Sequence, residues 1–281
     1  MVIKNQATAT TESAGETDCW EGLLGKCIDS IDSDEFHGNL VEALRTLVDI
    51  DYSVVFAYRN EDQPVCLDHT YSPQQRVIFV DDYIKGPYLL DPFFKACRKR
   101  FDTGLYRLRD IAPDRFLQSE YYRSYYNRTD LSEEVCYIFY PSSGPAVAIS
   151  LMRSKESPRF SAREFRLLDK VSPIVISLAR LHWKDVAGYF KPTSGNEQDQ
   201  DDHSLIEKSV GELFGDRITP RETEVIAQVL EGHSSESIAN SLGISTGTVR
   251  IHRRNIYAKL QISSQQELFA TFFKKITRVH G

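Results

Sequence analysis

The stretch 218–260 constrains the fold most, because signals that start and stop helices follow one another there at short intervals. In chain order they are the capping box Thr219-Pro-Arg-Glu222 with proline at the first helical position, the stop Gly232, the cap Ser234, the stop Gly243 and the cap Ser245. Only Gly243 and Ile244 separate the second helix from the third. That spacing predicts the compact turn of a helix-turn-helix. A fourth helix is expected over residues 264–276.

The third of these helices, residues 245–260, has two different faces when it is drawn at about 100° per residue. The apolar side holds Ser245, Val249, His252, Ile256 and Leu260, and the basic side holds Gly247, Arg250, Ile251, Arg254 and Ala258. No acidic residue occurs between positions 245 and 260, although a helix that only has to be soluble usually mixes Lys with Glu. The basic side is therefore typical of a helix that lies against a grooved polyanion.

Charge is divided unevenly between the two ends of the chain. The whole sequence of 281 residues has a net charge of −6. Residues 216–281 contain nine Lys or Arg and six Asp or Glu, a net of +3, so the preceding part carries a net of −9. This asymmetry favours the C-terminal end as the part that binds a polyanion.

A set of fixed spacings runs through residues 218–273. Its members are Thr219-Pro-Arg-Glu222, Val225, Ile226, Gly232-His-Ser234, Ile238-Ala239, Leu242, Ile244-Ser245, Thr248-Val-Arg250, His252, Asn255-Ile256 and Lys259-Leu260. The set resembles the LuxR-type helix-turn-helix, which is shared with the NarL/FixJ response regulators. One departure is Ser237, where that family usually has Glu. The resemblance implies a transcription regulator whose third helix lies in the major groove of double-stranded DNA.

The resemblance also implies roles for individual residues and partners. The implied roles are contact with DNA bases for Arg250, Ile251 and Arg254, contact with DNA phosphates for Thr246, Thr248, Arg253 and Lys259, and contact between two protomers for the fourth-helix stripe Leu268, Phe272 and Ile276. The three base-contacting residues are those that the helical wheel places on the basic side. A homodimer is therefore expected, and RNA polymerase is a further candidate partner.

The part of the chain before this domain has the periodicities of an α/β domain. The patterns predict a helix over 35–48, strands over 51–59 and 65–71, helices over 72–90 and 92–99, a strand over 104–108, a helix over 113–127, strands over 134–140 and 146–153, and a long helix from Ser161 towards Trp183. This order favours an α-β-α sandwich of the PAS or GAF kind, with a five-stranded, mostly antiparallel sheet. Such a sheet can enclose a small-molecule cavity.

These patterns divide the chain into four segments. They are a disordered tail over 1–20, a ligand-sensing α/β domain over 21–188, a polar and acidic linker over 189–215, and a DNA-binding domain over 216–281. The tail lacks the apolar centre of a secretory signal, and no apolar run is long enough to span a membrane. A cytoplasmic protein is expected.

Aromatic and acidic residues of the first domain mark a candidate ligand cavity, which we assign to Phe79, Tyr83, Tyr88, Asp91 and Tyr137. The spacing of Phe79, Tyr83 and Asp91-Pro92 is similar to the Trp, Tyr and Asp-Pro pattern of the acyl-homoserine-lactone regulators of quorum sensing. Phe79 in place of Trp removes an indole N–H, and the last spacing is one residue short. Another small molecule therefore stays open as the ligand, and Asp91, Glu133 and Glu134 leave room for a cationic one.

Other classes of function for the first domain have less support. A phosphoacceptor receiver lacks its alternating strand and helix pattern around Asp49 and Asp51. No nucleophile elbow, P-loop or dinucleotide fingerprint supports an enzyme. The five cysteines are scattered without metal-ligand spacing, so neither a metal nor a cofactor is expected. A domain that binds a partner protein and no ligand stays open as the alternative.

Overall fold

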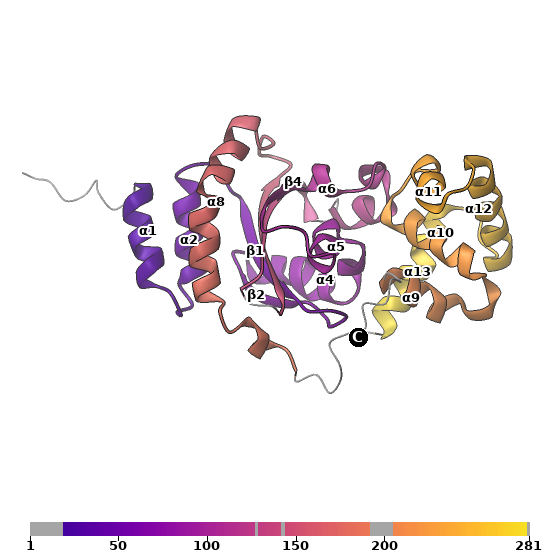
Figure 1. Ribbon diagram of the computed structural model, residues 1–281, viewed down its shortest axis with the longest axis horizontal. Helices are drawn as coiled ribbons and strands as arrows, with labels where there is room; N and C mark the ends of the chain where they lie inside the picture. The colour runs from indigo at the N-terminus through magenta and orange to yellow at the C-terminus, as the bar shows by residue number, and fades with distance from the viewer. Residues whose placement is uncertain (1–18, 127–128, 142–143, 192–204, 280–281) are drawn as a thin grey trace, which may run out of the picture.

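The computed structural model describes residues 19–126, 129–141, 144–191 and 205–279. The tail predicted for residues 1–20 lies outside the described residues apart from its last two, and so do residues 192–204 of the predicted linker. Figure 1 shows the described chain as successive layers: long helices, a sheet, shorter helices, and a helical C-terminal domain.

A five-stranded sheet forms the centre of the N-terminal domain. Its strands are β1 (Tyr52–Tyr58), β2 (Val65–His69), β3 (Gly104–Arg107), β4 (Leu131–Phe139) and β5 (Ala146–Ser154). They lie in the order β2-β1-β5-β4-β3, and every neighbouring pair is antiparallel. The predicted α/β fold with a five-stranded antiparallel sheet is confirmed.

Helices cover both faces of this sheet (Figure 1). One face carries α1 (Trp20–Asp29), α2 (Phe36–Arg45) and α8 (Ala162–His182), and the other carries α3 (Pro73–Arg76), α4 (Asp82–Ile84), α5 (Pro92–Arg98) and α6 (Leu108–Ile111). Successive strand residues point to opposite faces. Val55 of β1 therefore packs into the core under α2 and α8, and Phe56 packs into the core under α4 and α5.

Two of the predicted helices are divided into shorter turns. The helix predicted over 72–90 consists of α3, a π-helical turn at Val77–Asp81, α4 and a 3₁₀ turn at Pro87–Leu90. The helix predicted over 113–127 forms only in part among the described residues: Phe116–Gln118 is a 3₁₀ turn, Glu120 and Tyr121 are α-helical, and Tyr122–Tyr126 is π-helical. At the start of this segment the Arg115 backbone N–H donates to the Gly232 carbonyl of the C-terminal domain at 3.0 Å, so a tertiary contact accompanies the departure from a continuous α-helix.

The C-terminal domain is all α-helical. Its helices are α9 (Leu205–Phe214), α10 (Pro220–Glu231), α11 (Ser235–Leu242), α12 (Thr246–Leu260) and α13 (Gln265–Val279). The last four match the four predicted helices. α9 lies within the stretch predicted as linker, and it packs against α10 through a buried stripe that includes Val210.

A buried arginine fastens β5 to the start of α8. Arg153 is 1% exposed, and its guanidinium donates to the Asp49 carbonyl at 2.8 Å, to the Pro158 carbonyl at 2.9 Å and to Glu164 Oε1 at 2.6 Å. Glu164 is also the last residue of the predicted capping box, in which the Ser161 N–H donates to Glu164 Oε2 at 2.7 Å. The hydrogen bond from Arg153 is the main cause that lowers the pKa of Glu164 from 4.5 to about 2.

The Glu164→Gln variant is expected to unfold at a lower temperature than the wild-type chain at pH 7. Because the folded-state pKa of Glu164 is depressed, its ionised form stabilises the fold above pH 4.5, and this stabilisation is lost as the pH falls towards 2. The difference in unfolding temperature should therefore shrink between pH 5 and pH 3 in scanning calorimetry. Glu156→Gln, at an exposed position in the preceding turn, is the matched control and should follow the wild type throughout. A deficit that does not change with pH would contradict the role of the carboxylate.

Candidate DNA-binding surface and sensor cavity

Side-chain caps and glycine stops define the helix-turn-helix as the sequence predicts. The hydroxyls of Thr219, Ser234 and Ser245 accept hydrogen bonds from backbone N–H groups three residues further on, at 3.3, 3.0 and 3.0 Å. Gly232 and Gly243 end α10 and α11 in the left-handed region, with φ of 95° and 64°. These caps satisfy backbone groups that a helix end would otherwise leave without partners, so the short turns between the helices are stable.

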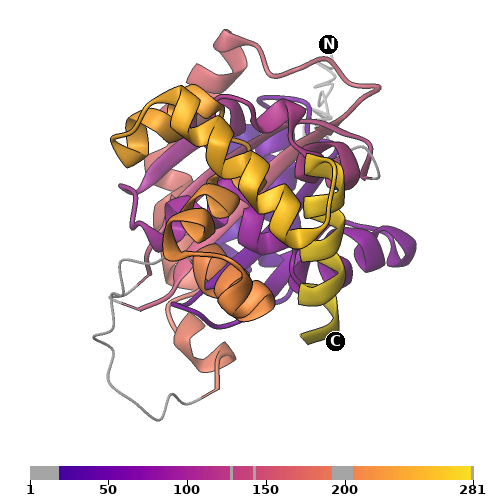
Figure 2. The same ribbon diagram turned by 90° about the vertical axis from the view of Figure 1, so that its right-hand side faces the viewer.

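Helix α12 presents its basic side outward. Val249, Ile256 and Leu260 are buried against the rest of the domain, whereas Arg250 and Arg254 are exposed and Ile251 is 51% exposed. Figure 2 shows α12 lying across the face of the molecule that points away from the sheet. The three residues predicted to contact bases therefore share one open surface.

Two of the four residues predicted to contact phosphates are occupied within their own domain. Lys259 Nζ donates to both carboxylate oxygens of Glu222, at 2.7 and 2.9 Å. Arg253 Nη2 donates to the Tyr257 hydroxyl at 3.2 Å and to Gln265 Oε1 at 3.1 Å. Thr246 is exposed at the start of α12, and the Thr248 hydroxyl lies 2.8 Å from the Ser245 hydroxyl. Contact of Lys259 or Arg253 with DNA requires these internal hydrogen bonds to be exchanged or shared.

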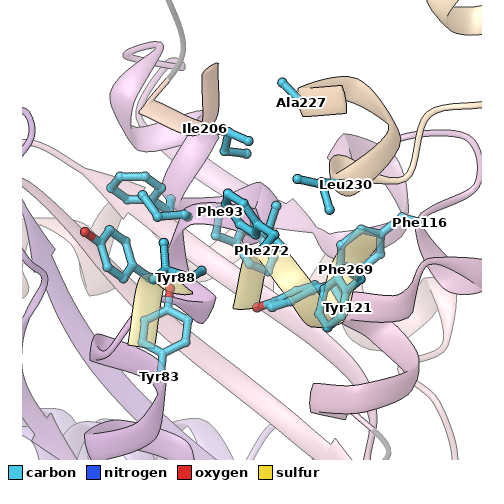
Figure 3. Close-up of a cluster of buried hydrophobic side chains, with 14 of the residues drawn as sticks. Tyr83, Tyr88, Phe93, Phe116, Tyr121, Ile206, Ala227, Leu230, Phe269 and Phe272 are labelled. Carbon is cyan, nitrogen blue, oxygen red and sulfur yellow. The ribbon is translucent and has the colours of Figure 1, made fainter. Parts of the chain in front are cut away.

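The stripe of α13 predicted to pair two protomers is covered by the chain itself. Leu268, Phe272 and Ile276 are only 1%, 0% and 3% exposed. They belong to one apolar cluster with Phe93 and Phe116 of the N-terminal domain (Figure 3). In this arrangement the stripe is not available to a second copy.

One close approach shows how tightly α13 docks on the N-terminal domain. A Cβ atom placed on Gly86 would lie 3.1 Å from Ile276 Cδ1, which is closer than ordinary van der Waals contact. Gly86 has a φ of 149°, a conformation that side-chain-bearing residues rarely adopt. A larger residue at position 86 would therefore push α13 away from the domain.

Polar contacts also join the two domains, mainly at the end of α10. Lys95 of α5 forms an ion pair with Glu231, which is only 6% exposed. The Ser234 N–H donates to Asp114 Oδ1 at 2.9 Å. Burial favours a higher pKa for Glu231, but hydrogen bonds from His233 and Lys95 outweigh burial and lower that pKa. The negative charge of Glu231 therefore depends on partners from both domains.

Gly232 brings the backbones of the two domains into direct contact. Its carbonyl accepts the hydrogen bond from the Arg115 N–H, and a Cβ atom at this position would lie 3.0 Å from Phe116 Cα. The φ of 95° also strains any other residue. Gly232 thus serves both as the stop of α10 and as a domain contact.

An aromatic cavity lies between the sheet and the shorter helices. Its volume is about 30 Å³, and it is lined by Val54, Phe56, Tyr58, Tyr71, Phe79, Tyr83, Asp91, Tyr121, Tyr125, Tyr126, Leu131, Glu134, Ser150 and Met152. Three residues of the predicted ligand set line it: Phe79, Tyr83 and Asp91. Tyr88 does not line it and packs on Phe94 instead, with ring centroids 5.0 Å apart. Tyr137 lies on the opposite face of the sheet, where its hydroxyl donates to the Leu168 carbonyl at 2.9 Å.

Two buried carboxyl groups face this cavity. Asp91 Oδ2 accepts a hydrogen bond from the Tyr83 hydroxyl at 2.6 Å, and Asp91 Oδ1 accepts one from the Phe93 N–H at 2.8 Å. Glu134 Oε2 accepts one from the Tyr126 hydroxyl at 2.8 Å. Burial raises the pKa of Asp91 to about 6. Burial and the nearby Asp91 raise the pKa of Glu134 to about 8. A carboxyl group that keeps its proton near neutral pH is typical of a functional site.

Of the two glutamates that the sequence offered for a cationic ligand, Glu134 lines the cavity, whereas the Glu133 carboxylate accepts a hydrogen bond from the Phe160 N–H. The predicted ligand set omits Tyr121 and Tyr126. The alternation of side chains between the two faces of β4 separates Glu134 from Tyr137. In a strand, residues an odd number apart point to opposite faces, so Glu134 and Tyr137 cannot both face one cavity. Tyr121 and Tyr126 lie on the α-helical and π-helical turns of the predicted 113–127 helix, and the sequence pattern did not show that they face the cavity.

Within the described ranges, no helix is both long enough and apolar enough to cross a membrane. The same part of the chain contains no group of three or more His, Cys, Asp or Glu side chains that could hold a metal ion.

Two matches decide the family. Residues 216–272 match the family model described as "Bacterial regulatory proteins, luxR family". The chain is also 32% identical over 186 residues to the "Putative HTH-type transcriptional regulator in exeN 3'region" of Aeromonas salmonicida, an alignment that covers 66% of this chain and 94% of that protein. The chain belongs to the LuxR family. As a LuxR-family protein it is a DNA-binding transcription regulator and not an enzyme.

Two further similarities of this LuxR-family chain each involve one domain. The LBD domain of VqsR from Pseudomonas aeruginosa is 28% identical, with a TM-score of 0.51 over 58% of this chain and 95% of that chain. The regulator MalT of Yersinia pestis (strain Pestoides F) is 38% identical over 50 residues, which cover 18% of this chain and 6% of that protein. The N-terminal domain therefore has the fold of a LuxR-family ligand-binding domain.

Proposed function

We propose that this LuxR-family regulator acts in the cytoplasm as a homodimer that binds a specific DNA sequence, and that a small molecule in the N-terminal cavity controls it. The observation that carries the proposal is the exposed surface of Arg250, Ile251 and Arg254 on α12. Each arginine can donate two hydrogen bonds to a guanine edge, and Ile251 can contact a thymine methyl group. RNA polymerase is a candidate partner of the DNA-bound dimer.

One route from the cavity to the domain interface runs through α5. Asp91 lines the cavity and caps this helix, because its carboxylate accepts the Phe93 N–H. One turn later on the same helix, Lys95 pairs with Glu231 of the DNA-binding domain. A ligand that changes the hydrogen bonding of Asp91 therefore acts on the helix that holds the second domain.

A second route runs through the tyrosine segment. Tyr121 lines the cavity and lies against Phe116, with ring centroids 5.8 Å apart. The backbone of Phe116 in turn lies against Gly232 of the DNA-binding domain. Because the cavity of about 30 Å³ holds roughly one water molecule, a larger ligand has to displace such rings. Displacement of Tyr121 would press on the docked domain.

Docking covers the α13 stripe but leaves the base-reading side of α12 open. The docked chain can therefore bind one DNA half-site weakly. Release of the DNA-binding domain from the N-terminal domain would let the α13 helices of two chains pair. We propose that the ligand shifts the population from docked to released chains by binding the released state more tightly. The finer assignment to quorum sensing has less support, because Phe79 lacks the indole N–H of the acyl-homoserine-lactone pattern.

Selection of the full-length chain on a random double-stranded DNA pool tests the proposal. We expect enrichment of an inverted repeat whose half-sites lie about one helical turn apart, roughly 10 base pairs. Sedimentation with the enriched DNA should give two chains for each site. Enrichment of no sequence would overturn the assignment of specific DNA binding to α12.

A further inference from the structure

The charge of the cavity is unusual for a buried site. Two of its fourteen lining residues, Asp91 and Glu134, are carboxylic acids, and none of the fourteen is Lys, Arg or His. Both acids are almost completely buried, at 8% and 7% exposure. Buried carboxylates are normally paired with a positive group. Here the described lining supplies none.

Among the described residues, the hydrogen-bond donors to the two acids are neutral groups, and they include the Ser150 side chain beside Glu134. Asp91 accepts from the Tyr83 hydroxyl and the Phe93 N–H, and Glu134 accepts from the Tyr126 hydroxyl. These donors orient the carboxyl groups but bring no positive charge to them. Each carboxylate can also accept more hydrogen bonds than it receives here.

A third polar group in the cavity has no partner. Tyr121 is 1% exposed and lines the cavity, yet its hydroxyl forms no hydrogen bond with any described residue. A buried tyrosine hydroxyl normally finds a hydrogen-bond partner. The Tyr121 hydroxyl therefore has spare capacity within a cavity that already holds two acids.

We propose that the cavity binds the primary ammonium group of a small organic amine. An ammonium group has one positive charge and three N–H donors, and it meets three acceptors here: the carboxylates of Asp91 and Glu134 and the hydroxyl of Tyr121. The apolar part of the amine lies against the rings of Phe56 and Phe79, whose faces also attract cations. This inference rests on the proposed function, because it names the ligand class for the same cavity.

A neutral amide fits the same cavity less well. A secondary amide has one N–H donor, so it leaves acceptors of the other groups unserved. It also brings no charge, so the acids have to stay protonated beside it. The number of acceptors and the lack of a basic side chain both favour the ammonium ion.

Binding of an ammonium ion exchanges a proton for the ligand. In the ligand-free chain the raised pKa keeps a proton on Glu134 at neutral pH. Apart from Asp91, the titratable groups that face Glu134 are Tyr71, Tyr121, Tyr126 and Cys136, and burial raises the pKa of each. They stay neutral across the neutral range, so the proton released on binding comes from the pair of acids. Affinity should therefore rise from pH 6 to pH 8.

The test uses calorimetric titration of the full-length chain with n-propylammonium and 2-phenylethylammonium chlorides. The neutral isosteres 1-propanol and 2-phenylethanol are the matched probes, and potassium chloride controls for ionic strength. We expect saturable binding of at least one ammonium salt, weaker or no binding of its alcohol, and proton release in buffers of different ionisation enthalpy. Glu134→Gln, which keeps the shape and the acceptor for Tyr126, should weaken the binding roughly 30-fold. Glu156→Gln at the exposed turn should leave it unchanged.

Each other outcome overturns a distinct statement. Binding of an alcohol as tight as that of its ammonium salt would overturn the ammonium assignment and leave small-molecule control standing. If both Glu134→Gln and Asp91→Asn bound the ammonium salt with wild-type affinity, the role of the two acids in binding would be overturned. If the chain bound neither the ammonium salts nor the alcohols, the ligand class would be overturned. If a wider small-molecule screen also found no ligand, a partner protein would be favoured as the regulator.

Discussion

Replacing Arg250 or Arg254 with alanine is expected to lower the affinity for the preferred DNA sequence by about 5- to 150-fold, with little change in affinity for unrelated DNA. The range corresponds to about 1–3 kcal/mol for one arginine that donates two hydrogen bonds to guanine. Both side chains are exposed on α12 and make no contact that the fold requires, so the unfolding temperature should not change. Competition binding with specific and scrambled duplexes at fixed salt measures the ratio.

Two further variants sharpen this comparison. Arg166→Ala lies at an exposed position of α8, on the far side of the sheet, and should bind both duplexes like the wild type. Thr246→Ala, at the exposed start of α12, should weaken both duplexes to a similar degree, because a phosphate contact carries no sequence information. An unchanged sequence preference in both arginine variants would remove them from the base-reading role.

The Lys95→Glu variant is expected to release the DNA-binding domain without any ligand. The substitution replaces the partner of the nearly buried Glu231 with a like charge. Loss of one partner of a buried ion pair costs about 3 kcal/mol or more, so the docked population should fall by roughly two orders of magnitude. Hydrogen exchange should rise in α13, and sedimentation should show a larger dimer fraction. DNA affinity should increase with it, since two linked half-sites are then engaged.

Lys95 lies on α5 and not on α13, so its substitution does not alter the proposed dimer surface. A change in dimerisation in Lys95→Glu therefore comes from release of the helix and not from an altered dimer surface. Lys170→Glu makes the same charge change at an exposed position of α8 and should behave as the wild type. Faster hydrogen exchange in α13 without a larger dimer fraction would show that release of the domain does not lead to the proposed pairing of α13. No change in exchange would show that the ion pair does not hold the domain.

Local chemistry accounts for the parts of the structure that the sequence predicted. The caps at Thr219, Ser234 and Ser245 and the stop at Gly232 act within a few residues, so their effect is visible in the sequence alone. The outward placement of Arg250 and Arg254 follows from the helical period in the same way. Runs of β-branched and aromatic residues bounded by turn residues predicted the strands in the same way. The period of two along a strand was not applied to Glu134 and Tyr137, which is why the predicted cavity included the wrong face of the sheet at Tyr137.

Packing between segments far apart in the chain decided the rest. The stripe of Leu268, Phe272 and Ile276 has the same pattern whether it meets a second copy or its own N-terminal domain, because periodicity identifies a buried face but not what buries it. The segment around Phe116 forms a 3₁₀ turn in place of a continuous α-helix, and the neighbouring Arg115 N–H bonds to Gly232, a residue more than a hundred positions later. The sequence by itself determined the exposed basic surface of α12, since one capped helix contains it. Only the tertiary structure decided the acid pair of the cavity and the covering of α13, since each requires residues that only the folded chain brings together.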